Sequence, residues 1–216
     1  MAIESNNKKE ILKLKLDGDW YLSEFEELLK LINNTYQIFY AINQLKNRFE
    51  SQFESQFENL KALEEISPFW HEYIYVLRKS VKLDSKKIPL IPFLPYQAMN
   101  YQNISDSIEK GEWYIYPNDQ IKINKIFMAS PGEIHIEAGS AIREIRELIK
   151  DIKYRNEHEK KLGELEILEK QIDILEKIGV PQQELGKILT RLKQNGTSLE
   201  EMIVKGKIGL LTDEKA

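Results

Sequence analysis

The fold is decided by residues 132–152, GEIHIEAGSAIREIRELIKDI, in which the spacing of apolar residues changes from two to three or four. In the first part Ile134 and Ile136 alternate with polar residues, which is the pattern of a β-strand buried on one face. After Gly139 and Ser140 the isoleucines recur at helical spacing. The change predicts an α+β fold, in which a small sheet is covered by helices.

The segment before this stretch predicts the other strand of a hairpin. Its apolar residues change parity between Ile123 and Ile126, so we expect a β-bulge near residues 124–125 that restores one apolar face. Residues 130–133, Ser-Pro-Gly-Glu, predict a type II turn with proline second and glycine third, where φ is positive.

One strand and a long helix are predicted at the N-terminal end. Three leucines alternate with lysines over residues 12–16, as in a strand buried on one face. Ser23 and Glu26 have the spacing of a capping box, so we expect a helix from Ser23 to about Leu45.

A short repeat, FESQFESQFE, follows at residues 49–58. Its period of four places Phe49, Phe53 and Phe57 on one helix face, with a drift of about 40° per repeat. Such a face is typical of packing against a core or a neighbouring helix. Another helix is predicted to begin at Ser67-Pro68.

Two heptad blocks occupy the region after Gly139. The spacings within each block are three, four and three, which is typical of helices that pair with other helices. A polar segment at 153–161 separates the blocks, and we expect further helix breaks at 179–181 and 195–196. The predicted partner-binding seam consists of Ile142, Ile145, Ile149, Ile152, Leu165, Leu168, Ile172 and Leu175.

Two arrangements of this seam are open. The blocks together span about 37 residues, or roughly 55 Å if helical throughout, which favours a projecting helix that dimerises the protein or binds a helical partner. Alternatively, two helices fold back on the rest of the chain with a bend near Gly163. We expect self-association.

Two regions are therefore predicted. Residues 1–139 would form an α+β head, in which one N-terminal strand and a hairpin make a small antiparallel or mixed sheet covered by helices. Residues 140–216 would form an amphipathic, coiled-coil-like helical region for oligomerisation or partner binding.

Composition limits the classes of function. Charged residues make up 31% of the chain, but the net charge is only -4, so no strongly basic surface for nucleic acid is expected. Cysteine is absent, which excludes disulfides, thiolate catalysis and Cys-ligated zinc. No apolar stretch approaches the roughly 18 residues of a membrane span, and residues 1–10 lack the apolar part of a signal peptide. We expect a cytoplasmic protein without a membrane contact.

No catalytic, cofactor-binding or metal-binding motif is recognisable, and we expect no cofactor. None of the three histidines lies at a metal-ligand spacing from another. Aromatic and basic residues near residues 73–96, together with the hairpin histidine, are a weak candidate surface for a ligand or nucleic acid. These residues are Tyr73, Arg78, Lys79, Lys82, Lys86, Lys87, Tyr96 and His135.

The sequence thus favours a non-enzymatic interaction protein, an oligomeric adaptor or scaffold in a bacterial multi-component system. The alternative is a regulatory module that senses a small ligand and couples the α+β head to the helical tail. An enzyme that uses acidic residues and His135 ranks last, because no nucleophile and base are paired in the sequence.

Overall fold

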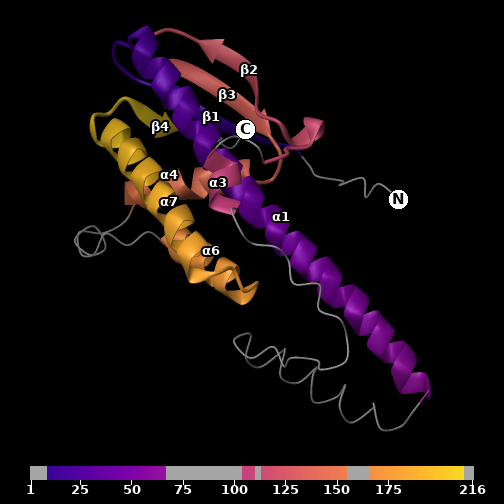
Figure 1. Ribbon diagram of the computed structural model, residues 1–216. Coiled ribbons are helices and arrows are strands. Elements are labelled where there is room, and N and C mark those ends of the chain that lie inside the picture. Colours follow the sequence, from indigo (N-terminus) through magenta and orange to yellow (C-terminus); the bar gives the residue numbers. More distant parts are fainter. Residues whose placement is uncertain (1–8, 67–103, 110–112, 155–165, 212–216) are drawn as a thin grey trace.

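The computed structural model describes residues 9–66, 104–109, 113–154 and 166–211 of the chain (Figure 1). This part has a mixed α/β fold with one four-stranded antiparallel sheet and five α-helices. In chain order the elements are β1 (Glu10–Leu16), α1 (Leu22–Ile66), α3 (Ile104–Glu109), the 3-10 helix η1 (Pro117–Asp119), β2 (Lys122–Phe127), β3 (Gly132–Ala138), α4 (Ile142–Tyr154), α6 (Glu166–Lys177), α7 (Gln182–Val204) and β4 (Ile208–Leu210). The predicted helix at Ser67-Pro68 lies outside the described residues.

The sheet has the strand order β2-β3-β1-β4, and each neighbouring pair is antiparallel. The predicted N-terminal strand and hairpin are confirmed. Leu12 pairs with Ile136 and Leu14 with Ile134, and all four side chains are buried on one face of the sheet. The opposite face carries the charged residues that alternate with them.

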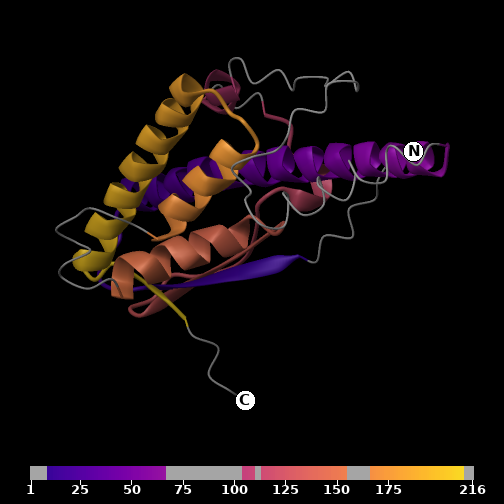
Figure 2. The ribbon, with the colours of Figure 1, turned by 90° about the horizontal axis from the view of Figure 1, so that it is seen from below.

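Figure 2 shows that the described helices lie on one side of the sheet. Helix α4 packs on β1 and α1, while α7 packs on α1, α4 and α6. The leucines of β1 and the isoleucines of β3 therefore form the floor of a single hydrophobic core. No described helix covers the charged face.

The hairpin contains the predicted bulge but a different turn. The register of β2 against β3 shifts between Ile123 and Lys125, which confirms a bulge at Asn124. The type II turn is wrong, because the Ser130-Pro131 peptide is cis and Gly132 does not have a positive φ. Glycine is needed for another reason: a Cβ there would lie 2.6 Å from the carbonyl oxygen of Phe127.

Helix α1 begins before the predicted Ser23. The N–H of Phe25 donates to the carbonyl of Tyr21 at 3.1 Å, which makes Tyr21 the N-cap residue. The N–H of Tyr21 in turn donates to Oε2 of Glu24 at 3.0 Å. A glutamate at the third helical position thus caps the first turn, and the predicted Ser23–Glu26 capping box is wrong.

The same helix continues past its predicted end at Leu45. It has 45 residues, or roughly 67 Å at 1.5 Å per residue. Its apolar side is buried from Leu28 to Leu45, whereas Asn47 and Arg48 are exposed. Figures 1 and 2 show its later half running beyond the other described helices and strands.

The C-terminal helices differ from the prediction at one of two breaks. Gly179, at φ 79°, ends α6, and the N–H of Val180 donates to the carbonyl of Leu175 at 3.0 Å, so the break at 179–181 is confirmed. The break at 195–196 is wrong, because α7 runs without interruption from Gln182 to Val204. An interior glycine costs about 1 kcal/mol in a helix, but Gly196 is buried in line with the core side chains of α7, and this packing outweighs the cost.

Strand β4 was not predicted. It follows Gly206, whose φ of 70° reverses the chain after α7, and it pairs with β1 through Leu14 and Leu210. The end of the described chain therefore belongs to the same sheet as its beginning. The regions 1–139 and 140–216 share one sheet and one core, and the boundary near Gly139 separates β3 from α4.

Candidate functional site

The first block of the predicted seam lies inside the protein's own core. Ile142, Ile145, Ile149 and Ile152 on α4 are between 0% and 4% exposed. Helix α4 is covered by β1, α1, α6 and α7. In the described chain these isoleucines therefore stabilise the monomer fold.

The second block is covered in the same way. Leu168 and Leu175 on α6 are buried and Ile172 is half-buried, while Leu165 lies outside the described residues. Helix α6 packs against α1, α4 and α7. Of the two arrangements that the sequence leaves open, α4 and α6 have the folded-back one.

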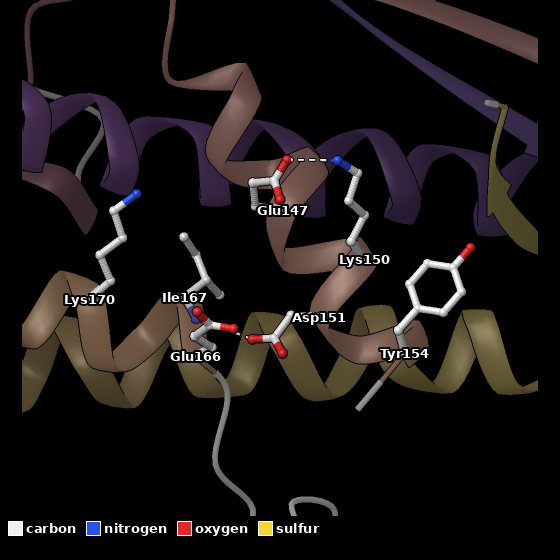
Figure 3. Close-up of a pocket in the computed structure, with 7 residues that line it drawn as sticks. All are labelled: Glu147, Lys150, Asp151, Tyr154, Glu166, Ile167 and Lys170. Atoms are coloured by element: carbon white, nitrogen blue, oxygen red, sulfur yellow. Dashed lines mark hydrogen bonds and ion pairs between the residues drawn. The ribbon is translucent and has the colours of Figure 1, made fainter. Parts of the chain in front are cut away.

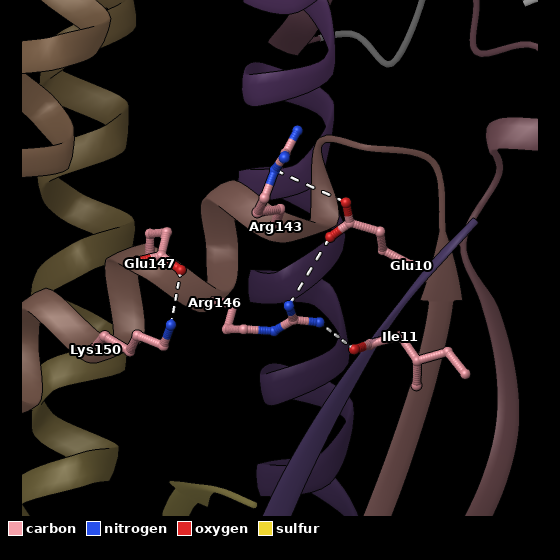
Figure 4. A network of polar contacts seen from close by, with 6 residues as sticks. All are labelled: Glu10, Ile11, Arg143, Arg146, Glu147 and Lys150. Carbon is pink, nitrogen blue, oxygen red and sulfur yellow. Dashed lines mark hydrogen bonds and ion pairs between the residues drawn. The ribbon is translucent and has the colours of Figure 1, made fainter. Parts of the chain in front are cut away.

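Polar contacts from α4 hold it on β1 (Figure 4). Arg146 donates a hydrogen bond to the carbonyl oxygen of Ile11 and lies 3.9 Å from a carboxylate oxygen of Glu10. Arg143 reaches the other oxygen of Glu10 at 3.8 Å. Because β4 pairs only with residues 14–16, Arg146 supplies a donor to the part of β1 that β4 leaves open.

A buried polar cluster joins α1, η1 and the junction between β3 and α4. Asp119 is 2% exposed, and its Oδ2 accepts a hydrogen bond from the Tyr40 hydroxyl at 2.9 Å. The Tyr36 hydroxyl donates to the backbone carbonyl of Asp119 and accepts the N–H of Gly139 at 3.2 Å. The two tyrosine rings stack with centroids 5.8 Å apart.

The cluster changes the acidity of its phenols. Burial, which disfavours the phenolate, raises the pKa of Tyr36 above its ordinary value and that of Tyr40 to about 12. Both tyrosines therefore stay protonated and act as hydrogen-bond donors to Asp119. The cluster is not predictable from the sequence. Tyr36 and Tyr40 are four residues apart on one helix face, but no local pattern indicates that Asp119 is their partner.

A pocket of about 370 Å³ lies between α4 and α6 (Figure 3). Asp151 on α4 accepts the N–H of Ile167 at 3.1 Å and so caps the first turn of α6. Glu147 and Lys150 pair at 2.9 Å on its wall. Most of the lining is charged, unlike the mainly apolar lining of typical small-molecule pockets. The lining residues are Glu147, Lys150, Asp151, Tyr154, Glu166, Ile167 and Lys170.

His135 lies on the charged face of the sheet, as the alternation in β3 predicts. Its Nε2 is 3.2 Å from Oε2 of Glu133, an oxygen that Lys125 also approaches to 2.6 Å. The Lys125 hydrogen bond is the main cause that lowers the pKa of Glu133. A ligand role for His135 stays a prediction, and its proposed companions Tyr73, Arg78, Lys79, Lys82, Lys86, Lys87 and Tyr96 lie outside the described residues.

Four exposed apolar residues lie on β2 or directly after it, and we call them the β2 strip: Ile123, Ile126, Phe127 and Met128. Their exposed fractions are 43%, 45%, 55% and 59%. Phe127 pairs with Glu133 and so belongs to the charged face. Ile123 and Ile126 pair with Ile136 and Ile134, which are fully buried, so they belong to the helix-covered face of the sheet. The described helices cover that face at β1 and β3, whereas its two isoleucines on β2 are partly exposed.

The described residues contain no group of three or more acidic or histidine side chains placed to hold a metal ion. No helix in the same part of the chain is both long and apolar enough to span a membrane. Comparison of the chain with protein-family models, with curated proteins and with solved structures yields no match.

Proposed function

We propose that the protein is a non-enzymatic interaction protein, an oligomeric adaptor or scaffold. In this proposal the α/β body holds α1 rigidly, and the projecting half of α1 provides a helical surface for assembly. The observation that supports it is the length of α1: its described core residues lie between Phe25 and Phe49, and its later half runs beyond the other described elements (Figures 1 and 2).

The anchored half of α1 is held from several sides. It packs against α4, α6 and α7, and its Tyr36 and Tyr40 are hydrogen-bonded through Asp119 to the start of the hairpin. At the N-terminal end, Lys207 contacts Glu24 and lies 5.4 Å from the centre of the Trp20 ring. These contacts fix the direction in which the rest of the helix leaves the body.

The sequence of the projecting half is suited to pairing. Phe49, the last phenylalanine of α1 with a described side chain, is half-buried and packs against the core. The four-residue repeat places Phe53 and Phe57 on the same helix face, among glutamate, serine and glutamine. A helix with one aromatic face and one polar face is stabilised when the aromatic face is covered by another helix.

Light scattering coupled to size exclusion tests this proposal with a double variant, Phe53→Ser and Phe57→Ser. We expect the wild type to exceed its 25.4 kDa monomer mass and the variant to fall toward it. The matched control is Gln52→Ser with Gln56→Ser, one position away on the helix, which should assemble as the wild type does. Equal masses for wild type and both variants would refute assembly through α1.

A ligand-sensing module is the second candidate, and the pocket between α4 and α6 favours it. A molecule bound there would contact both helices, which are otherwise linked by the Asp151 cap of α6. A ligand that binds only the folded state raises the melting temperature, so a thermal-shift screen of nucleotides and metabolites tests this candidate. The same shift must be lost in Lys170→Met, because Lys170 lines the pocket.

A further inference from the structure

We propose that β2 is the pairing edge for a second copy of this chain, so that two four-stranded sheets join into one across a two-fold axis. This proposal concerns a different surface from α1 and does not depend on the helical assembly proposed above. It rests on the exposure of the β2 strip, on the cover of the other sheet edge, and on the self-complementarity of β2.

The two edges of the sheet differ in the hydrogen bonds that other parts of the chain make to them. At one edge, the strand β4 has only three residues, and the part of β1 that runs past it is covered: Arg146 donates to the carbonyl of Ile11, and the N–H of Leu211 donates to the carbonyl of Lys13 at 3.2 Å. At the other edge, no hydrogen bond from a described residue outside β3 reaches the backbone of β2. Figure 1 shows β2 as the outermost strand of the sheet. A strand with unpaired N–H and C=O groups is a template for pairing with another strand.

Lysines and β-bulges often protect an edge strand from pairing with another strand. Here the side chains of the lysine and of the bulged residue contact glutamates on the charged face. Lys125 pairs with Glu133 at 2.6 Å, and the side-chain amide of the bulged Asn124 donates to Glu137 at 2.7 Å. This hydrogen bond is the main cause that lowers the pKa of Glu137, and Lys122 contributes to the same effect. The positive charge of β2 is thus compensated within one chain, and the apolar face of the edge stays uncovered.

We consider an antiparallel register that is centred between Asn124 and Lys125, so that each of these residues lies opposite the other in the second copy. It places Ile123 opposite Ile126 of the second copy, and both belong to the apolar face in each chain. It places Lys122 opposite Phe127 of the second copy on the charged face, so no two lysines are directly opposed. Two copies would gather four isoleucines beneath the joined helical layers. Because exposed apolar area is removed from water, this cluster favours the paired state.

The absence of cysteine makes the register directly testable in the full chain. Single-cysteine variants are mixed in pairs, one of them carrying an affinity tag, and oxidised in a glutathione buffer. Directly opposed residues lie about 4.5–5.5 Å apart between Cα atoms, within the range that a disulfide spans. We expect crosslinked heterodimers from Ile123→Cys with Ile126→Cys, and from Lys122→Cys with Phe127→Cys.

The exchanged pairs are the matched controls. Ile123→Cys with Phe127→Cys, and Lys122→Cys with Ile126→Cys, place the cysteines on opposite faces and should crosslink at least ten-fold less. Equal crosslinking of all four pairs, or none in variants with the wild-type circular dichroism spectrum, would overturn the proposal. If Ile123→Cys does not fold, the pair on the charged face decides alone, since both of its positions are exposed.

The experiment is repeated in the Phe53→Ser, Phe57→Ser background. Crosslinks that persist there, while the assembly through α1 is lost, show that β2 pairing is independent of α1. Crosslinks absent from both backgrounds refute β2 pairing and leave the test of α1 unaffected.

Discussion

Tyr40 donates its hydroxyl proton to Oδ2 of Asp119 over 2.9 Å, although the two residues are 79 positions apart in the chain. The same hydroxyl accepts the N–H of Tyr116 at 3.3 Å. One phenol therefore connects the middle of α1 to the segment that leads into the hairpin, and the connection is buried. The same segments are also joined by the Tyr36 hydroxyl, which donates to the carbonyl of Asp119, and by the Trp113 indole, which donates to Gln44 at 3.0 Å.

Removing that hydroxyl should destabilise the protein. Tyr40→Phe leaves a buried carboxylate oxygen without its donor and the N–H of Tyr116 without its acceptor, which costs about 1–3 kcal/mol in the free energy of unfolding. Urea titration followed by circular dichroism measures the change. Tyr21→Phe is the control, since it removes a hydroxyl from a ring that is 74% exposed, and it should change stability by less than about 0.5 kcal/mol.

The raised phenol pKa values predict a loss of stability at alkaline pH. Tyr40 has a pKa of about 12 in the folded protein against an ordinary value of 10, so between these values the folded state holds a proton that the unfolded state has lost. The free energy of unfolding should therefore be unaffected by this group below pH 10 and fall as pH rises toward 12. Urea titrations at increasing pH measure the slope. A slope as steep in Tyr40→Phe as in the wild type would contradict the assignment to Tyr40.

Two glycine-to-alanine substitutions should change the stability of the protein in opposite directions. In Gly139→Ala the new Cβ would lie 2.7 Å from Oδ1 of Asp119, and displacement of that buried side chain should cost about 1–3 kcal/mol. Gly186 lies on an exposed part of α7, where an added Cβ would meet no heavy atom within 4 Å apart from the neighbouring backbone of its own helix. Gly186→Ala should therefore stabilise the helix by about 0.5–1 kcal/mol. The melting temperature, measured for both variants and the wild type, should fall in Gly139→Ala and rise in Gly186→Ala.

Truncation of a seam isoleucine should weaken folding without changing assembly. Ile149 is 0% exposed in the monomer, so Ile149→Ala should lower the free energy of unfolding by roughly 2–5 kcal/mol. Light scattering under native conditions should give the wild-type mass. A variant that folds with wild-type stability but dissociates would instead place Ile149 between chains.

Replacement of one buried amide should stabilise the protein. Gln171 on α6 is 1% exposed, and neither the nitrogen nor the oxygen of its amide has a hydrogen-bond partner among the residues that the structure describes. Gln171→Met keeps a similar shape and removes a desolvated polar group, so the free energy of unfolding should rise by about 1–2 kcal/mol. A decrease in urea midpoint would show that the amide is bound in the native protein.

The sequence predicted those elements whose pattern is local. Alternating apolar residues identified β1 and the hairpin, and the parity change after Ile123 located the bulge. Gly179 with Pro181 marked the end of α6 because a left-handed residue followed by proline cannot continue a helix. These signals depend on neighbours within a few residues.

The errors arose where contacts distant in sequence decide the structure. Gly196 continues α7 because its position is buried against other helices, and β4 forms because β1 offers it an edge. The heptad spacing of α4 correctly predicts an apolar helix face that must be buried, but periodicity does not specify which element buries it. Here β1, α1, α6 and α7 do so, and the candidate surfaces for partners are the far half of α1 and the β2 strip.

Strand β4 has a consequence for biosynthesis. On the ribosome β1 emerges before the other described elements, yet its partner β3 follows more than a hundred residues later, and β4 follows after all the described helices. The apolar face of β1 therefore lacks the cover of α4 until residue 154 has been translated, and the sheet lacks its last strand until residue 210 has been translated. The sheet is complete only when residues 208–210 have left the exit tunnel, so such a chain completes its fold after translation more than during it.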